Sequence, residues 1–225
     1  MSLDFSAASN GLTIGGLALS SSQLCLAGWL KVTAATGGTG PAVLHVRDNN
    51  TTGKTAGIGM DGVLGTTSVD MFTPTTGGTG ITTPMFTATL NKWYFIAMTI
   101  NGTTFTAYWS QAGGGGVLNT TNTTDATAIT SYSDFWAGSD DSSNLIPGVL
   151  AAVSIWSGAS ALILSTNLQN QMLSQKPVFT PGLFAQYPMF AQGDGNKDFS
   201  GNGHNLTYPV TKPTTDVGPP CSWAF

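Results

Sequence analysis

Residues 93–109 read WYFIAMTI-NG-TTFTAYW, two runs of aromatic and β-branched residues on either side of Asn101-Gly102. Such runs are typical of β-strands, and they predict one strand from Trp93 to Ile100 and another from Thr104 to Trp109. Asn-Gly favours a two-residue type I′ turn, because both central positions of that turn need positive φ. The stretch therefore predicts an antiparallel hairpin with Asn101 and Gly102 in its turn.

The first strand of this hairpin is apolar on both faces. Successive side chains of a strand point to opposite faces of the sheet. Apolar residues on both faces indicate a strand that is covered on both sides. We therefore expect a central strand of a two-layer sandwich. One face would hold Tyr94, Ile96, Met98 and Ile100, and the other Trp93, Phe95, Ala97 and Thr99.

Short apolar runs separated by Gly, Thr, Asn and Asp continue almost to residue 157 and indicate an all-β domain. Residues 34–40, 73–83 and 112–127 hold almost no apolar side chains and are predicted to be surface loops. One helix is expected at residues 160–175, where apolar residues recur at three- and four-residue spacings before Pro177. The other predicted strands are Leu3 to Phe5, Gly11 to Ile14, Leu24 to Val32, Ala42 to Arg47, Ala56 to Met60, Val69 to Phe72, Ser133 to Ala137, Val149 to Trp156 and Leu183 to Phe190.

Charge is scarce in this chain of 225 residues. Charged residues make up 8% of the sequence and the net charge is -4. Six lysines and one arginine provide no basic stripe that would neutralise several phosphates, so nucleic-acid binding and attraction to anionic membranes are disfavoured. No apolar stretch approaches the roughly 20 residues of a membrane-spanning helix. The composition predicts a soluble protein whose surface is polar but nearly uncharged.

The N-terminus and the two cysteines bear on whether the protein is exported and forms a disulfide bond. If Met1 is the native start, the sequence carries no signal peptide, because no charged segment and apolar core precede Leu3. Two cysteines are too few for a disulfide framework in a domain of this size. Cys25 and Cys221 are expected to be either one bridge between the two ends of the chain or two free thiols.

Six segments follow one another in an order that resembles a known family. They are Leu3-Asp4-Phe5 with Leu12-Thr13-Ile14, Leu26 to Lys31 around Trp29, Lys92 to Ala97, Ala137 to Asp140, Pro147 to Trp156, and Asp198 to His204. Together they resemble the laminin-G-like jelly roll of the concanavalin A-like lectin and glucanase superfamily, over residues 2–207.

This resemblance implies an antiparallel, two-sheet β-sandwich with one short helix near the C-terminus. We expect one domain at residues 1–207, which includes the helix at 160–175, and a Pro-rich extended tail at 208–225 that docks on its own domain or on a neighbouring subunit. Many relatives carry acidic residues in the closing strand, where this chain has Ala151-Ala152. Calcium binding is therefore not carried over from the family.

Two loops nevertheless present oxygen ligands of the kind that Ca²⁺ prefers. One holds Asp194, Asn196 and Asp198 at alternate positions, and the other holds Asp140, Asp141 and Asn144. The first loop lacks the bidentate glutamate of an EF-hand, because Asn205 stands at that position. The alternative for each loop is an Asx-rich turn without a metal. Calcium is the candidate cofactor, and no other is indicated.

Aromatic residues near the predicted strand ends are candidates for binding glycans, because flat rings stack on the apolar faces of sugars. They are Tyr108, Trp109, Tyr132 and Trp136, and the alternative is that they close the ends of the core. His45 and His204 make no catalytic case, since the chain has no nucleophile elbow. We expect His45 to lie in a sheet and His204 in an exposed loop.

No glutamate occurs in the chain, and all eleven acidic residues are aspartates. Sugar cleavage on this fold usually rests on a pair of carboxylates, most often glutamates. We therefore expect no enzymatic activity, and instead a lectin-like structural or adhesion protein. Its expected place is a virion surface, as a capsid or tail decoration within a homo-oligomer or larger assembly, where it would bind glycans. The alternatives are a secreted carbohydrate-binding adhesion module and an aspartate-based polysaccharide hydrolase or lyase.

Overall fold

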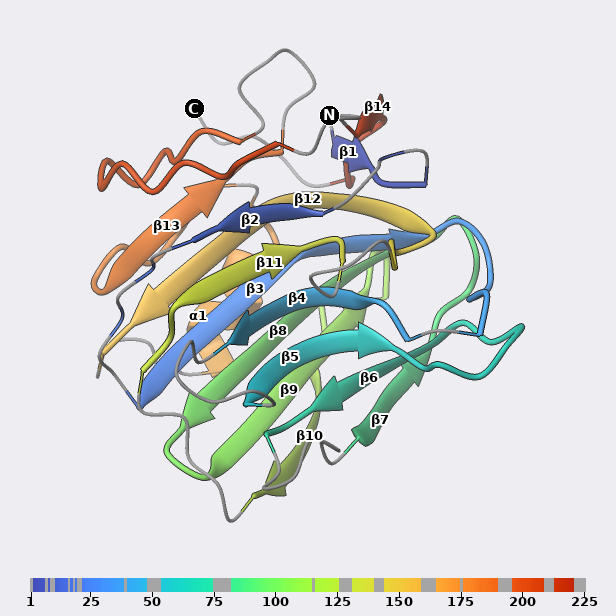
Figure 1. Cartoon of the computed structure of the whole chain (residues 1–225), viewed down its shortest axis with the longest axis horizontal. Helices are drawn as coiled ribbons and strands as arrows, with labels where there is room; N and C mark the ends of the chain where they lie inside the picture. Colours follow the sequence, from blue (N-terminus) through green and yellow to red (C-terminus); the bar gives the residue numbers. More distant parts are fainter. Residues whose placement is uncertain are drawn as a thin grey trace.

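Two antiparallel sheets pack face to face in the computed structural model (Figure 1). The structure describes residues 2–6, 8, 11–15, 17, 19, 22–38, 40–47, 54–74, 82–114, 116–125, 131–139, 144–158, 165–174, 176–189, 196–208 and 213–220. The β-sandwich expected from the strand pattern is confirmed, and its arrangement is consistent with a jelly roll.

Sheet A contains eight of the described strands, and its order along the main path is β10-β9-β8-β3-β12-β1-β14. Strand β13 also pairs with β12, along residues 153–156, which follow the residues of β12 that pair with β1. The strands are β10 (Asn119–Thr124), β9 (Thr104–Gln111), β8 (Trp93–Asn101), β3 (Gln23–Val32), β12 (Gly148–Ser157), β1 (Ser2–Asp4), β14 (Thr214–Asp216) and β13 (Leu183–Tyr187).

Sheet B contains six of the described strands in the order β2-β11-β4-β5-β6-β7. In Figure 1 it lies in front of sheet A. The strands are β2 (Leu12–Ile14), β11 (Asp134–Ala137), β4 (Ala42–Arg47), β5 (Thr55–Met60), β6 (Ser68–Phe72) and β7 (Thr82–Thr87).

The inner faces of the two sheets form the main core. Their alternate residues point inward and bury aliphatic and aromatic side chains between the sheets, as binary patterning requires. Nearly all of these side chains are shielded from solvent. Members of this core include Leu26 and Leu30 of β3, Ile96 and Met98 of β8, Leu44 and Val46 of β4, Ile58 of β5 and Phe135 of β11.

A second apolar cluster lies on the outer face of sheet A, which we call the covered face. Helix α1 (Ser165–Gln171) packs on it through Leu168 and, just after its end, Met172, which are four residues apart and so lie on one side of the helix. Gln171 holds the chain that follows, since its amide donates to the carbonyl of Lys176 at 2.9 Å and accepts from the N–H of Val178 at 2.8 Å. The sheet contributes Cys25, Ala27, Trp29, Trp93, Phe95, Ala97, Val149, Ala151, Ala152 and Trp156.

Strand β8 confirms the prediction of a central strand that is buried on both faces. It lies between β9 and β3, with Ile96 and Met98 in the main core and Trp93 and Phe95 in the outer cluster. The predicted turn was wrong by one residue. Asn101 pairs with Thr104, so the two turn residues are Gly102 and Thr103, and only Gly102 has positive φ. A single positive φ at the first turn position suits glycine and leaves Asn101 in the strand.

Three strands were missed. Strands β7 and β10 have threonine-rich sequences that were interpreted as loops, and β14 lies in the segment that was predicted to be an extended tail. Strand β7 begins at Thr82, inside the predicted loop 73–83, and β10 lies wholly inside the predicted loop 112–127. Both are edge strands, which pair with a neighbouring strand on one side only. β-Branched threonine favours the extended backbone of such a strand and can face solvent. The helix covers Ser165–Gln171, and residues 160–164 and 175 of the predicted span lie outside the described residues.

The C-terminal segment contributes to sheet A. Strand β14 pairs antiparallel with β1, and Lys31 of β3 forms an ion pair with Asp216. The last five residues, Cys221 to Phe225, lie outside the described part of the chain, and so does any bridge to Cys221. Cys25 is buried in the outer cluster, and burial raises the pKa of its thiol well above its usual range. No helix among the described residues is long and apolar enough to cross a membrane.

Candidate functional site

The four aromatic residues predicted to bind glycans do not come together. Trp109 packs against the main core and stacks on Phe86, with the ring centroids 6.0 Å apart and the planes at 19°. Tyr108 points the other way, toward the cluster on the covered face. Neighbouring residues of one strand cannot share a face, so these two rings belong to different surfaces.

Tyr132 and Trp136 are also separated. Tyr132 is 1% exposed, so it presents no ring face to a sugar, and core packing, the alternative considered for it, describes its position. Burial raises the pKa of its hydroxyl well above the usual range. Trp136 of β11 is half-buried on the outer face of sheet B. Of the four, Trp136 lies beside the pocket described below.

The predicted calcium loop at Asp198 is organised by hydrogen bonds to that carboxylate. It accepts from the N–H groups of Gln186 at 3.0 Å, Ser200 at 2.8 Å and His204 at 3.0 Å, and from the Ser200 hydroxyl at 2.8 Å. Burial alone would raise the pKa of Asp198, but these donors hold it below its usual value. This is the Asx-turn arrangement that was the alternative to a metal.

The other predicted calcium ligands are only partly described. Asn196 donates its amide to the carbonyl of Leu206 at 2.9 Å, and Asn144 lies half-buried beside the bridge between Ser139 and Leu145. Asp140, Asp141 and Asp194 lie outside the described residues. Among the residues that the structure does describe, no three His, Cys, Asp or Glu side chains gather as a metal site. Calcium binding stays a prediction.

His204 differs from its expected exposure. Its ring is half-buried and stacks on Phe184, with the centroids 3.8 Å apart and the planes at 19°. This stacking holds the Asp198 loop against β13, because Phe184 belongs to that strand. His204 therefore has a structural role in this loop.

The outer face of sheet B, which we call the pocket face, carries a row of aligned residues across its strands. Trp136 of β11 pairs with His45 of β4, His45 with Gly57 of β5, and Gly57 with Phe72 of β6. Phe72 pairs in turn with Thr82 of β7. Because side chains alternate, this row points away from the core that their neighbours form. His45 is confirmed as a sheet histidine.

Three aromatic rings follow this row. His45 and Trp136 lie parallel, with centroids 6.3 Å apart and planes at 8°, and His45 and Phe72 are also 6.3 Å apart, tilted at 52°. Gly57 lies between His45 and Phe72, and a Cβ atom there would lie 2.2 Å from the Leu44 carbonyl oxygen and 2.6 Å from the His45 Cβ. A glycine is therefore required at this position for the strands and rings to approach so closely.

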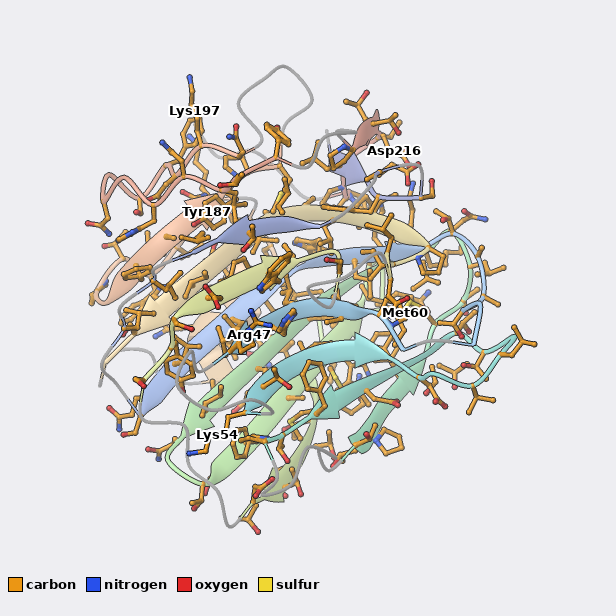
Figure 2. All side chains as sticks on the ribbon, in the orientation of Figure 1. Arg47, Lys54, Met60, Tyr187, Lys197 and Asp216 are labelled. Atoms are coloured by element: carbon orange, nitrogen blue, oxygen red, sulfur yellow. The ribbon has the colours of Figure 1, made fainter. Side chains whose placement is uncertain are left out.

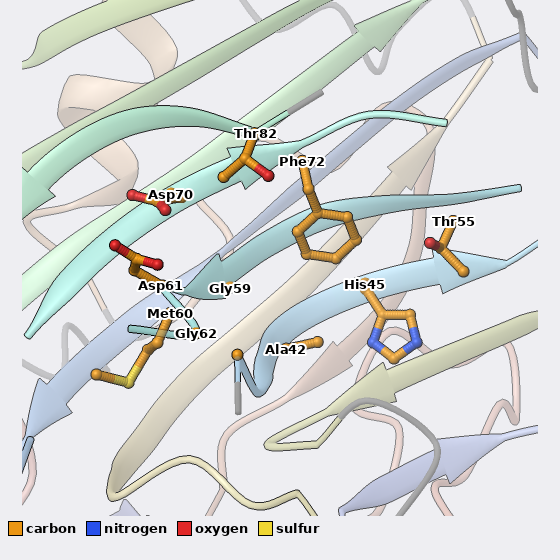
Figure 3. A pocket seen from close by; sticks show the side chains of 11 residues that line it. Ala42, His45, Thr55, Gly59, Met60, Asp61, Gly62, Asp70, Phe72 and Thr82 are labelled. Atoms are coloured by element: carbon orange, nitrogen blue, oxygen red, sulfur yellow. The ribbon is translucent and has the colours of Figure 1, made fainter. Parts of the chain in front are cut away.

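A pocket of about 320 Å³ opens beside these rings, over β4 to β7 (Figure 3). We call it the β4–β7 pocket. Gly59, which has no side chain, is among the residues that line the pocket. The other lining residues supply two rings, two carboxylates and two hydroxyls. The side chains that supply these groups are His45, Phe72, Asp61, Asp70, Thr55 and Thr82.

The charge of one pocket carboxylate, Asp61, acts on the other, Asp70. Asp70 is 5% exposed, and burial raises its pKa; the nearby negative charge of Asp61 raises it further, while a hydrogen bond from Ser68 opposes the shift. The Ser68 hydroxyl donates to Asp70 Oδ1 at 3.0 Å, and the Val63 N–H donates to Asp61 Oδ1 at 3.0 Å. Each carboxylate thus has one oxygen held by the protein.

An ion pair borders the same face. Arg47 of β4 and Asp134 of β11 are cross-strand partners, and Arg47 Nη2 donates to Asp134 Oδ2 at 3.4 Å. In Figure 2, Arg47 lies on the front sheet, and Lys54 lies at the lower end of the same region. Asp134 therefore neutralises the guanidinium that points to the pocket face.

Another hollow, of about 410 Å³, lies on the covered face beside α1. Trp29, Met172, Leu173 and Pro220 form apolar walls, and Gln111 is already engaged by the Tyr94 hydroxyl at 3.2 Å. No charged side chain is among its described lining residues. Its chemistry is less suited to orienting a polar ligand than that of the β4–β7 pocket.

Sequence reasoning missed most of the β4–β7 pocket. His45 was given no binding role, and Phe72, Asp61 and Asp70 were not considered as ligands. One signal was present: Gly57 and Gly59 alternate in a predicted strand, which indicates close approach of other groups. The partners that approach them come from other strands, which the linear sequence does not identify.

Two solved structures of a phage tailspike share the fold at a TM-score above 0.5, and a laminin structure matches more weakly. Tailspike protein 2 of an Escherichia coli O157:H7 bacteriophage matches at a TM-score of 0.58 and 12% identity over 79% of this chain, which spans 25% of the tailspike. The enzymatically active domain of the same tailspike, from bacteriophage CBA120, matches at 0.57 and 12% identity over 79% of this chain and 28% of that one. Domains LG4-5 of the mouse laminin α1 chain match at 0.48 and 12% identity over 69% of this chain and 40% of theirs.

The sequence itself matches a family model. No curated protein matches the chain. The model of the concanavalin A-like lectin/glucanases superfamily, in its laminin-G form, matches residues 6–161, which include strands β2 to β12 of both sheets. The chain belongs to the concanavalin A-like lectin/glucanases superfamily.

Proposed function

We propose that this chain is a non-enzymatic, lectin-like structural or adhesion protein that binds a glycan in the β4–β7 pocket. The observation that carries the proposal is the combination of ring walls and hydrogen-bonding groups in one hollow. Phe72 and His45 provide the rings, and Asp61 and Asp70 provide carboxylate oxygens. Sugars present both an apolar ring face and hydroxyls, so they need both kinds of partner.

The pocket is preorganised for such a ligand. The His45 ring is held between Trp136 and Phe72, and Ser68 fixes the Asp70 carboxylate. A site whose groups are already ordered loses less conformational entropy when the ligand binds. Carboxylates accept hydrogen bonds from sugar hydroxyls, and the Thr55 and Thr82 hydroxyls can donate as well as accept.

We propose a virion surface as the place of action, as a decoration of a capsid or tail within a homo-oligomer or larger assembly. The low-charge surface suits contact with other proteins, and the likeness to a phage tailspike makes a phage particle the first place to look. Nucleic acid and membranes are not expected partners. The alternative is a secreted carbohydrate-binding adhesion module. Sedimentation of the protein from its native source separates the two, since a decoration protein travels with a large particle.

A glycan array tests the binding proposal. We expect at least one glycan to bind, and Phe72→Ala to weaken that binding about tenfold or more, as loss of a central aromatic contact does in binding sites. Phe199→Ala is the matched control, because Phe199 is 53% exposed in a loop that does not line the pocket. Equal binding by both variants, with both folded by circular dichroism, or no bound glycan on the array, would overturn the proposal.

A second candidate is hydrolysis of the bound glycan, and one observation favours it. Asp61 and Asp70 line the same pocket, and the raised pKa of Asp70 is what a general acid needs. If the chain is an enzyme of this kind, new reducing ends appear when it is incubated with a glycan that it binds, and Asp70→Asn abolishes them. Binding without new reducing ends supports the non-enzymatic proposal.

A further inference from the structure

We infer that the β4–β7 pocket selects amino sugars, with the protonated amine placed between Asp61 and Asp70, and rejects sugars that carry carboxylate or sulfate groups. This inference rests on the proposed function and deepens it, since it names the class of glycan. It follows from the charges around the pocket, from the position of both carboxylates in one pocket, and from the oxygens that they leave open.

The described charges that line the pocket are all negative. Asp61 and Asp70 are the two charged side chains among the described residues that line the pocket, which contain no lysine or arginine. The nearest guanidinium on the same face, that of Arg47, is paired with Asp134. An anionic sugar would meet two negative charges and no lysine or arginine among the described lining residues, whereas a cationic sugar would meet opposite charge.

The two pocket carboxylates carry like charge. The charge of Asp61 raises the pKa of Asp70, so the two groups are close enough to interact. Asp70 is also largely buried, which makes its negative charge costly to hold. A cation between the two groups removes both costs, because it offsets the repulsion and replaces lost solvation.

Each of the two carboxylates has one oxygen that is open to a ligand. Ser68 occupies Asp70 Oδ1, and the Val63 N–H occupies Asp61 Oδ1. Neither Oδ2 atom has a protein partner among the described residues, and both side chains line the pocket. An ammonium group carries three N–H donors and no acceptor, so it can serve both open oxygens at once. A hydroxyl has a single donor and cannot.

Three trisaccharides of matched length form the test: one of β-1,4-linked glucosamine, its fully N-acetylated form, and one of uronic acid. Titration calorimetry is run at several pH values from about 6 to 7, because a sugar amine is a weaker base than an α-amino group and must be protonated to offer a cation. EDTA is present, so that no divalent cation bridges the carboxylates. We expect the glucosamine form to bind about tenfold tighter than the N-acetylated form, and the uronic acid form weakest.

Two variants locate the preference. Asp61→Asn and Asp70→Asn each remove one charge while keeping a similar shape and the oxygen that accepts from Val63 or Ser68. Each is expected to reduce the tenfold preference for the glucosamine form over the N-acetylated form to about threefold or less. Asp4→Asn removes the same charge from β1 in sheet A, away from the pocket, and should leave the preference unchanged. Added salt should reduce the preference in the unmodified protein.

The outcomes separate this inference from the proposal beneath it. If the glucosamine and N-acetylated forms bind equally, and both lose affinity in Phe72→Ala, the pocket binds glycans but does not select amines, and only the inference fails. A preference that persists in both asparagine variants also overturns it. If array and titrations reveal no glycan that depends on Phe72, the proposed function fails.

Discussion

Both outer faces of the sandwich carry aromatic residues, yet the two faces differ in what covers them. On the covered face, Trp29 and Trp156 are surrounded by alanine, cysteine and phenylalanine, and α1 packs over them. On the pocket face, Trp136 and Phe72 have glycine, aspartate and threonine as neighbours, and a hollow remains beside them. Aromatic content alone therefore does not identify a binding surface; what surrounds the rings does.

This difference follows from the residues that surround each ring. A continuous apolar surface must be covered, because its exposure to water is unfavourable in proportion to its area. The covered face has such a surface, and helix α1 meets that need. Carboxylates and glycines interrupt the apolar area of the pocket face, so no covering element is required there. Four substitutions test this comparison.

The largest effect is expected on the covered face. Trp156 is fully buried, and its indole N–H donates to the Phe179 carbonyl at 2.8 Å. Trp156→Ala should lower the free energy of unfolding by about 3–5 kcal/mol, through a cavity and an unpaired carbonyl. Urea denaturation followed by circular dichroism measures the change. A loss below about 1 kcal/mol would mean that the cover over this face contributes little.

The next effect concerns the close approach on the pocket face. Gly57→Ala places a Cβ against the backbone of β4, and should cost about 1–3 kcal/mol in the same denaturation experiment. Gly37→Ala is the matched control, because its added Cβ meets nothing within 4 Å; it should change stability by about 0.5 kcal/mol or less. Similar values for the two variants would show that the rings tolerate a wider spacing.

A smaller effect is expected from the aromatic row itself. Trp136→Ala removes the parallel contact with His45, at a cost of about 1 kcal/mol, since Trp136 is only partly buried. The contrast with Trp156→Ala is the measurement of interest. If the two tryptophan variants lost equal stability, the pocket face would be as important to folding as the covered face.

The smallest effect depends on pH. Because the pKa of Asp70 is raised in the folded state, its carboxylate lowers stability above that pKa, and protonation removes the penalty. Asp70→Asn should therefore be more stable than the unmodified protein near neutral pH, by less than the Trp136 effect. The gap should close as the pH falls toward about 3.9, the ordinary aspartate value. Urea titrations at several pH values measure it, and a gap that widens on acidification would contradict the expected sign.

Much of the fold was predictable because alternation is a local property. The two apolar faces of Trp93 to Ile100 indicated a central strand, and β8 occupies that position. The edge strands β7 and β10 were missed, since threonine-rich segments pair only when a neighbour offers its edge. The hairpin turn shifted by one residue because glycine, not asparagine, takes the positive φ.

The candidate site was far less predictable. The chosen rings Tyr108 and Trp109 are adjacent in sequence and therefore point to opposite faces. Asp198 has the ligand-like spacing of a calcium loop, but its oxygens accept hydrogen bonds from nearby backbone groups. His45 and Phe72 are far apart in the chain and meet only through the pairing of each with Gly57.

The sequence alone determined that this protein is an all-β sandwich with few charges, because strand alternation and composition are written residue by residue. It also determined the family, through segments whose order the fold preserves. Only the tertiary structure decided which outer face is covered and which holds a pocket. That decision depends on strand order and register, which set which side chains of different strands lie side by side.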